Sequence, residues 1–280
     1  MAEKREWGIE NRESGIDTAP PERLPLPLRI QPIPHSPFPI AGSLMSDHIV
    51  KSFDEELIHL NSAIARMGEL SQTQLAGALD SLLLRDTTVA AHVIKGDLEV
   101  DTLERELDAR AIRVIALRQP IARDLREVLS ALRIGIEFER VCDFAANIAK
   151  RAIALGKHSP DAWISEIAEL GNLALKLLAD VVVAFRERNS EKALAVWAQD
   201  EQLDDTYTGI YRRLIDFMKE DPQRVPIGAH LLFIAKNIER IGDHATNIAE
   251  SVYYLVTGEA LTAPRPKGDK SSFDQVDDRR

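Results

Sequence analysis

Residues 121–156 read IARDLREVLSALRIGIEFERVCDFAANIAKRAIALG. Within this stretch, apolar side chains recur every three or four residues, the spacing that places them on one face of an α-helix. The stripe consists of Ile134, Phe138, Val141, Ala145, Ile148, Ala152 and Leu155. The β-branched residues follow the same spacing and do not alternate with polar ones, as they would in a strand. The stretch therefore predicts a long amphipathic helix.

The same spacing extends over most of the chain and predicts an all-α protein with six helices. The only prolines between Asp47 and Thr257 lie between helical segments, where they end one helix or begin the next. The predicted helices cover residues 47–84, 87–118, 121–156, 160–188, 190–220 and 226–257. Because the loops are short, neighbouring helices must run antiparallel. We expect two tandem antiparallel three-helix bundles, arranged end to end.

Proline and glycine mark the expected domain boundaries. Eight of the 14 prolines lie between Pro20 and Pro39, so residues 1–44 are expected to form a disordered, proline-rich extension. Gly156 and Pro160 separate a first bundle, residues 45–157, from a second bundle, residues 158–258. The polar residues 259–280 are expected to form a disordered C-terminal tail.

Composition disfavours several classes of protein. The net charge of -10 argues against a nucleic-acid partner, which is bound mainly through neutralised phosphates. The only cysteine, Cys142, cannot form an internal disulfide, which favours a reducing cytoplasm. No apolar run approaches the roughly 18 residues of a membrane-spanning helix, and the N-terminus lacks the apolar region of a secretion signal. We expect a cytoplasmic protein that is not inserted into a membrane.

An internal repeat is the most informative feature. Glu139-Arg140-Val141-Cys142-Asp143 recurs 100 residues later as Glu239-Arg240-Ile241-Gly242-Asp243. Upstream, Asp97 and Asp101 have counterparts in Asp200 and Asp204. Each acidic pair has i, i+4 spacing, which places both carboxylates on one helix face. In each half, the two pairs lie at matching heights of a predicted helical hairpin, so they can meet.

Clustered carboxylates repel one another and need a cation nearby. Lys or Arg can supply it, but oxygen ligands from facing helices are also what a hard metal ion requires: Fe, Mn, Mg or Ca rather than Zn. The predicted ligands are Asp97, Asp101, Glu139 and Asp143 in the first half, and Asp200, Asp204, Glu239 and Asp243 in the second. The alternative is a solvated face, because Asp143 lies about 200° around the helix from Val141. In either case, we expect these acids to be open to solvent.

Other candidate residues carry weaker signals. Glu56 and His59 have the ExxH spacing of di-iron oxidases, but that fold needs the motif twice. His244 adjoins Asp243 and is either a supporting hydrogen-bond donor or an ordinary structural histidine. Arginines at seven-residue spacing form one face that is either solvated or a docking surface: Arg126, Arg133 and Arg140. No set of residues typical of a catalytic site occurs, so we do not expect an enzyme.

Across residues 45–258, the chain resembles the PhoU family of regulators of bacterial phosphate transport. The resemblance rests on Gln119-Pro120-Ile121-Ala122-Arg123-Asp124-Leu125-Arg126, on the two Glu-to-Asp motifs, and on the run from His230 to Glu250. It implies two three-helix bundles, a multinuclear metal cluster on each with iron foremost, cytoplasmic residence and a homodimer. It also implies a negative regulator of the phosphate-starvation response, acting between the ATPase subunit of a phosphate ABC transporter and a phosphate-sensing histidine kinase.

The sequence departs from the family pattern at a few positions. Residue 137 is Glu where the family more often has Asp, and Cys142 and Phe144 replace the Gly242 and His244 of the second copy. The two sites are therefore not expected to be equal. A carboxylate-bridged di-metal oxidase or hydrolase stays the alternative to a regulatory adaptor, and the single ExxH motif weighs against it.

Overall fold

The computed structural model describes residues 43–158, 160–263 and 265, with side chains from Phe53 onward. These residues form six α-helices, one short 3₁₀ helix and no strand. The elements are α1 (Ser43–Leu84), α2 (Thr87–Arg118), α3 (Ala122–Leu155), α4 (Asp161–Arg186), α5 (Ser190–Glu220), η1 (Pro222–Arg224) and α6 (Val225–Thr257). The predicted all-α fold and its six helices are confirmed. The predicted disordered extension, residues 1–44, falls almost wholly outside the described residues.

The helix ends follow from local side chains and backbone conformation. Asp86 caps α2, because its Oδ1 accepts a hydrogen bond from the backbone nitrogen of Thr88 at 2.7 Å. Asn189 caps α5 in the same way through the backbone nitrogen of Lys192 at 2.9 Å. At the end of α6, Gly258 adopts the left-handed conformation that ends helices, with φ 82°. These short polar caps set the connections that make successive helices antiparallel.

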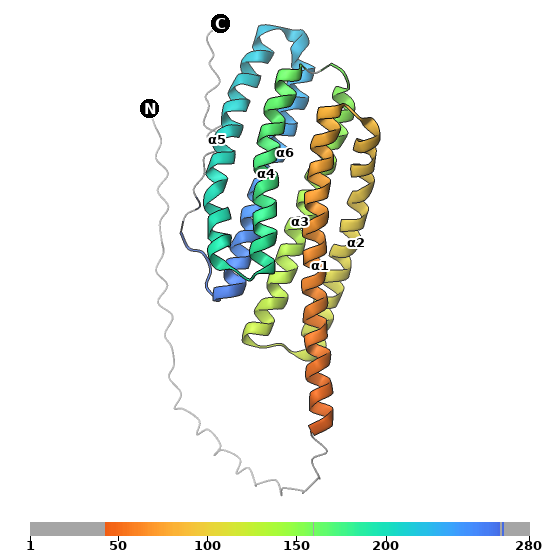
Figure 1. The fold of residues 1–280 in the computed structure, drawn as a ribbon, viewed down its shortest axis with the longest axis vertical. Helices are drawn as coiled ribbons and strands as arrows, with labels where there is room; N and C mark the ends of the chain where they lie inside the picture. The colour runs from red at the N-terminus through yellow and green to blue at the C-terminus, as the bar shows by residue number, and fades with distance from the viewer. Residues whose placement is uncertain (1–42, 159, 264, 266–280) are drawn as a thin grey trace, which may run out of the picture. The chain divides into compact units, whose positions relative to one another are not determined.

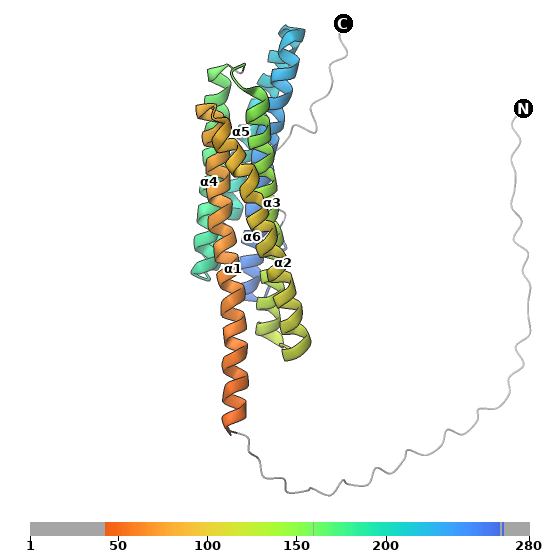
Figure 2. The same ribbon diagram turned by 90° about the vertical axis from the view of Figure 1, so that its right-hand side faces the viewer.

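The two predicted bundles pack side by side. Helices α1, α2 and α3 pack together, as do α4, α5 and α6, while α3 also packs along α6 and α1 along α4 (Figure 1). A view from the side shows the same pairing of α3 with α6 (Figure 2). The end-to-end arrangement expected from the sequence is therefore wrong, because the long apolar faces of α3 and α6 are buried against each other. All six helices belong to one compact unit that begins at Ser43.

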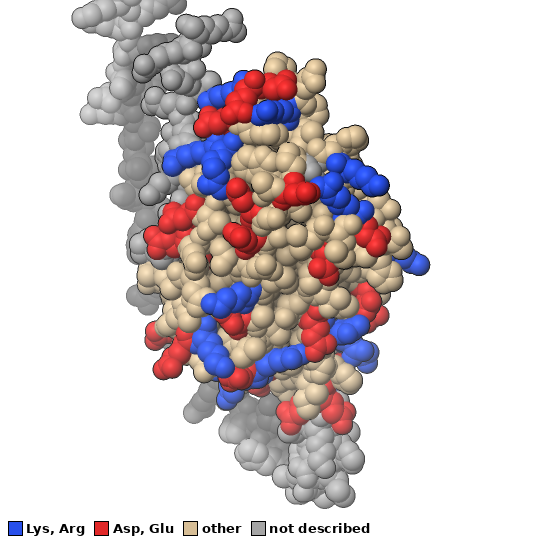
Figure 3. Space-filling view, turned by 45° about the horizontal axis from the view of Figure 1, so that its top comes forward, with Lys and Arg blue, Asp and Glu red and all other residues tan. Residues whose placement is uncertain are grey.

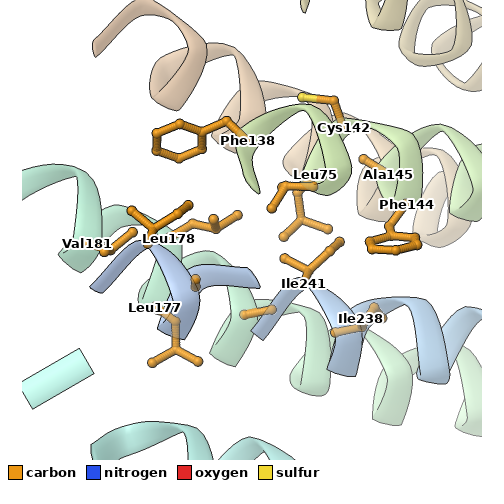
Figure 4. Packing of buried hydrophobic residues seen from close by; sticks show 14 of the residues in the cluster. Leu75, Phe138, Cys142, Phe144, Ala145, Leu177, Leu178, Val181, Ile238 and Ile241 are labelled. Atoms are coloured by element: carbon orange, nitrogen blue, oxygen red, sulfur yellow. The ribbon is translucent and has the colours of Figure 1, made fainter. Parts of the chain in front are cut away.

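One hydrophobic core runs through both halves. Figure 4 shows Phe138 of α3, Leu178 of α4 and Ile241 of α6 in the same cluster, and each is almost fully buried. The ring of Phe138 lies against the backbone of α1 at Gly68, where an added Cβ would lie 3.1 Å from Cζ of Phe138 and 2.7 Å from Cγ2 of Val182. Only a residue without a side chain fits there, so Gly68 lets α1 approach α3 and α4 closely. No helix in the described part of the chain is long and apolar enough to span a bilayer.

A buried ion pair also joins the two halves. Glu127 of α3 is 8% exposed and accepts a hydrogen bond from Nδ2 of Asn61 at 2.7 Å. Its two carboxylate oxygens also pair with the guanidinium of Arg188, in the turn between α4 and α5. Burial alone would raise the pKa of Glu127, but the hydrogen bonds from Arg188 and Asn61 outweigh it and hold that pKa below its ordinary value of 4.5. Glu127 therefore stabilises the folded chain in its charged form.

We expect Glu127→Gln to lower the free energy of unfolding by about 1.5–3 kcal/mol at pH 7. The substitution replaces a buried carboxylate by a neutral amide, so the hydrogen bonds from Arg188 and Asn61 lose their charged acceptor. Because the pKa is depressed in the folded state, the stabilisation is present above the ordinary value of 4.5 and is lost as the pH falls. Urea unfolding from pH 7 down to pH 4 measures both effects. Glu220→Gln, at an exposed pair with Arg224, is the control and should change little. Equal stability of the two variants at pH 7 would contradict the assignment.

Candidate functional site

The first acidic cluster lies between α2 and α3. Asp97 and Asp101 come from α2, and Glu139 and Asp143 come from α3. Burial, then the charge of Asp143, then that of Asp101 raise the pKa of Asp97. Burial and then the charge of Asp143 raise the pKa of Glu139 in the same way, with a smaller part from Asp101. The four predicted carboxylates thus lie within electrostatic range of one another, as the matching heights predicted.

The first cluster is partly open to solvent, and an arginine of the same helix accompanies it. The side chains of Glu139 and Asp143 are 23% and 40% exposed. Arg140 lies 3.5 Å from Glu139 (Nε to Oε2) and 3.6 Å from Asp143 (Nη1 to Oδ2), and is itself 54% exposed. Such exposed, long ion pairs stabilise little. Glu104, which can extend this cluster, has a pKa raised by burial and then by the nearby charges of Asp108 and Asp101.

The second acidic cluster lies between α5 and α6 and is much more deeply buried. Asp200, Asp204 and Glu239 are 0%, 2% and 3% exposed, whereas the side chain of Asp243 is 33% exposed. The expectation that all the acids are open to solvent is therefore wrong for three of the four in this half. The physical reason is that positive side chains accompany the buried carboxylates, so they need not face water.

Two basic residues supply that positive charge. Lys236 Nζ lies 2.7 Å from Oε1 of Glu239, one turn further along α6. Arg265, which follows α6, pairs through Nη2 with Oδ2 of Asp200 and lies 2.8 Å from Oδ1 of Asp243. The Arg265 side chain is only 13% exposed. Its guanidinium thus occupies the second cluster as an internal cation.

Burial raises the pKa of Asp200 to about 6, although Arg265 opposes the shift; the charges of Asp204 and Asp243 add to it. The second carboxylate oxygen of Asp200, Oδ1, is buried without a hydrogen-bond partner. It lies where a side chain at position 242 would be, since a Cβ added to Gly242 would come within 2.9 Å of it. Glycine at this position therefore leaves room for the carboxylate.

The residues fit a hard metal ion in their chemistry. All eight predicted ligands are carboxylates, and Asp97 Oδ1, like Asp200 Oδ1, is buried without a hydrogen-bond partner. As they stand, no three His, Cys, Asp or Glu side chains of the described chain form an arrangement that would hold a metal ion. The assignment of two metal sites therefore stays a prediction.

Cys142 does not add a thiolate to the first cluster. Its Sγ donates towards Oγ of Ser71 in α1, at 3.4 Å, and the residue is 1% exposed. Burial raises the pKa of Cys142 to about 12, so its thiol is neutral at pH 7. Where the second copy has Gly242, the first copy thus has a side chain that packs on α1.

His244 and Glu137 meet between the two halves. Nδ1 of His244 lies 2.5 Å from Oε2 of Glu137, and Nδ2 of Asn247 donates to the same oxygen at 3.1 Å. The His244 ring also packs against the ring of Phe144, with 5.3 Å between centroids. This favours the structural interpretation of His244 over a supporting role at Asp243. It also explains the departure at residue 137, where a glutamate reaches from α3 to α6.

The remaining candidates lie outside both clusters. Glu56 forms a long pair with Arg110 at 3.8 Å, and His59 is exposed. On the face shown in Figure 3, basic and acidic side chains alternate and form no continuous basic surface. Of the candidate docking arginines, Arg133 and Arg140 are exposed, whereas Arg126 packs against the backbone of Gly258 at the end of α6. Arg123, in the first turn of α3, is also exposed.

Sequence reasoning missed Arg265 and Lys236. Arg265 belongs to the segment predicted as a disordered tail, and a single arginine there has no periodicity that would predict its position. Lys236 was identifiable, because it precedes Glu239 by three residues and therefore lies on the same face of α6.

Fold and site together define a class of duplicated all-α proteins, in which two neighbouring helices of each half bring acidic side chains together. Comparison with known proteins identifies the class. The PhoU domain model matches residues 64–152 and 167–252, and the chain belongs to the PhoU family.

Curated relatives and solved structures agree with this assignment. A phosphate-specific transport system accessory protein PhoU homolog from Caulobacter vibrioides is 44% identical over 226 residues, which cover 80% of this chain and 98% of the relative. One from Xylella fastidiosa is 42% identical, covering 84% of this chain and 98% of the relative. The crystal structure of PhoU from Pseudomonas aeruginosa matches with a TM-score of 0.72 at 34% identity, covering 74% of this chain and 100% of that chain.

Proposed function

We propose that this chain is an accessory regulator of a phosphate-specific transport system, which keeps the phosphate-starvation response off when phosphate is plentiful. The observation that carries the proposal is the match to the Caulobacter relative over 98% of that relative's length. Both acidic motifs lie within the residues that the PhoU domain model matches. The partners proposed are the ATPase subunit of a phosphate ABC transporter and a phosphate-sensing histidine kinase, met in the cytoplasm. A homodimer is proposed as the working form.

In this proposal, the mechanism is contact between proteins. The long helices form a rigid unit, because one core and the Glu127–Arg188 pair connect the two halves. Arg123 and Arg133 are exposed on α3 and can pair with acidic groups of a partner. Arg133 also lines a hollow of about 470 Å³ between α3 and α6, together with Glu250 and Tyr254. Such a surface suits a protein that bridges two others.

Hard metal ions, with iron as the first candidate and Mn, Mg or Ca as alternatives, belong to the same proposal. Asp97, Asp101, Glu139 and Asp143 would hold the ions of the first half, and Asp200, Asp204, Glu239 and Asp243 those of the second. When bound, such ions would cross-link neighbouring helices through their carboxylates. The fold of this chain would hold these carboxylates at matching heights on neighbouring helices.

The regulatory role is tested in the organism that carries this chain. Deletion should switch phosphate-starvation genes on in phosphate-rich medium, as measured with a reporter fused to a starvation promoter. The wild-type chain should restore repression, and Arg123→Ala/Arg133→Ala should not. Arg110→Ala/Arg113→Ala, which removes two exposed arginines of α2, is the matched control and should repress normally.

Each outcome has a separate meaning. Silent starvation genes in the deletion strain under rich medium would contradict the regulatory role. Normal repression by Arg123→Ala/Arg133→Ala would leave the role standing and place the docking surface elsewhere. Arg126→Ala is kept out of this test, because Arg126 packs on Gly258 and its loss can affect folding.

A further inference from the structure

The segment after α6 turns back along the bundle. Gly258 ends the helix in the left-handed conformation, and the hydroxyl of Thr257 accepts a hydrogen bond from the backbone nitrogen of Glu259 at 3.1 Å. Ala260 and Leu261 then line the hollow between α3 and α6 that also contains Arg133. The chain therefore runs along α6 in the opposite direction, towards the second acidic cluster.

The length of this segment matches the distance it must cover. Asp243 lies 14 residues before Thr257, or about 21 Å along α6 at about 1.5 Å per residue. Arg265 lies seven residues after Gly258, and an extended chain of that length spans at most about 25 Å. An arginine at position 265 can thus just reach the height of Asp243.

The contact that Arg265 makes offsets the cost of a buried charge. Its guanidinium joins Asp200, which is fully buried, to Asp243, and it is itself 13% exposed. A carboxylate as buried as Asp200 requires a compensating positive charge. In the first cluster, Arg140 is 54% exposed and more than 3 Å from either acid, so it does not play the same part.

The same position would also attract a metal ion. Oδ1 of Asp200 is buried and has no hydrogen-bond partner, and Nε of Arg265 is likewise buried without one. The guanidinium therefore leaves part of the hydrogen-bonding capacity of the site unused. A divalent cation carries twice its charge and accepts several carboxylate oxygens at once.

We propose that Arg265 is an internal cation that competes with a hard metal ion for the second acidic cluster, so that metal binding there releases Glu259–Ala263 and Arg265 from the bundle. The proposal rests on the metal sites proposed above. The cation paired with the first cluster, Arg140, is 54% exposed and held at longer distances, so this cluster should fill at a lower metal concentration than the second. The two halves would then respond to different metal concentrations, and release of this segment would signal that the second is filled.

Titration with Mn²⁺, followed by calorimetry, tests the competition in the full chain. The background is Asp97→Asn/Asp143→Asn, which disables the first cluster and leaves the second to be measured alone. In this background, Arg265→Ala should bind Mn²⁺ at least about tenfold more tightly, because the ion no longer displaces a charge-assisted contact. The Mn²⁺ affinity of Arg265→Lys should lie between the affinities of the parent and of Arg265→Ala. Arg113→Ala, which removes an exposed arginine elsewhere, should bind Mn²⁺ as the parent does. Circular dichroism confirms that each variant is folded.

Thiol labelling at Leu261→Cys provides a second readout that does not depend on affinity, because residue 261 is half-buried and lines the hollow between α3 and α6. In an otherwise wild-type chain, Mn²⁺ should speed the reaction of the new thiol with a labelling reagent, and a chelator should restore the slower rate. The native thiol of Cys142 is 1% exposed and should stay unreactive. With Arg265→Ala added, the new thiol should react fast with or without metal. Equal Mn²⁺ affinity in Arg265→Ala and its parent, or labelling that Mn²⁺ leaves unchanged, would overturn the competition while leaving the metal sites in place. Absence of Mn²⁺ binding in every protein, including the wild type, would instead overturn the metal proposal and the competition with it.

Discussion

Replacement of Phe138 by alanine should lower the free energy of unfolding by about 3–5 kcal/mol, the range typical of large aromatic side chains removed from a core. Phe138 is 1% exposed, and its ring lies against Gly68 of α1 and in the same cluster as Leu178 of α4. The cavity would therefore open where the two halves join. At roughly 2–4 °C per kcal/mol for a chain of this size, the melting temperature should fall by roughly 6–20 °C.

The same experiment shows whether the halves unfold together. If both belong to one cooperative unit, calorimetry of Phe138→Ala should show a single transition at lower temperature. Phe233→Ala is the matched control, because Phe233 is 54% exposed and should cost less than about 1 kcal/mol. Two separate transitions, only one of them shifted, would show that the shared core does not couple the halves.

The second large expected effect is the loss of bound metal ions when one acid of each cluster is removed. Asp143→Ala/Asp243→Ala should remove most bound Fe, Mn or Mg while helix content is retained. These two acids are suitable because their side chains are 40% and 33% exposed, so their loss should disturb packing little. Elemental analysis of purified protein measures the metal, and circular dichroism measures the helices. Asp80→Ala/Glu169→Ala removes two exposed acids outside both clusters and serves as the control.

Unchanged metal content in the double variant would show that the acidic clusters are not the metal sites.

The two sites should also differ in how fast they lose metal to a chelator. The first cluster is half open, so a chelator should strip it without denaturant. The buried Asp200, Asp204 and Glu239 should slow the loss from the second.

Sequence reasoning predicted the helices well because their signals are local. Apolar spacing, Asp86 and Gly258 each act within a turn or two, and every helix end falls within four residues of its predicted position. Pairing of the acids was also predictable, since the height of Asp97 or Asp143 in a hairpin depends only on helix length and loop position.

The packing of the halves was not predictable in the same way. An apolar stripe shows that a face is buried but does not show which helix covers it, so the stripe through Phe138 and Val141 gave no sign of α6 or α4. The burial of Asp200 depends on Arg265, which comes from a segment without pattern. The sequence contained one usable hint of the contact between halves, the unusual glutamate at 137 that bonds His244.

Pairing of α3 with α6 has a consequence for symmetry. The two helices carry the two copies of the repeat, so their contact resembles the interface of a symmetric dimer made within one chain. In a true homodimer, every substitution would appear on both sides of the twofold axis at once. Here Phe144 contacts His244, which is its own counterpart in the repeat. Glu137 bonds the same histidine, and the repeat does not require the equivalent bond in the other direction, from position 237 to position 144. Joining both copies in one polypeptide thus allows each side of the interface to vary independently.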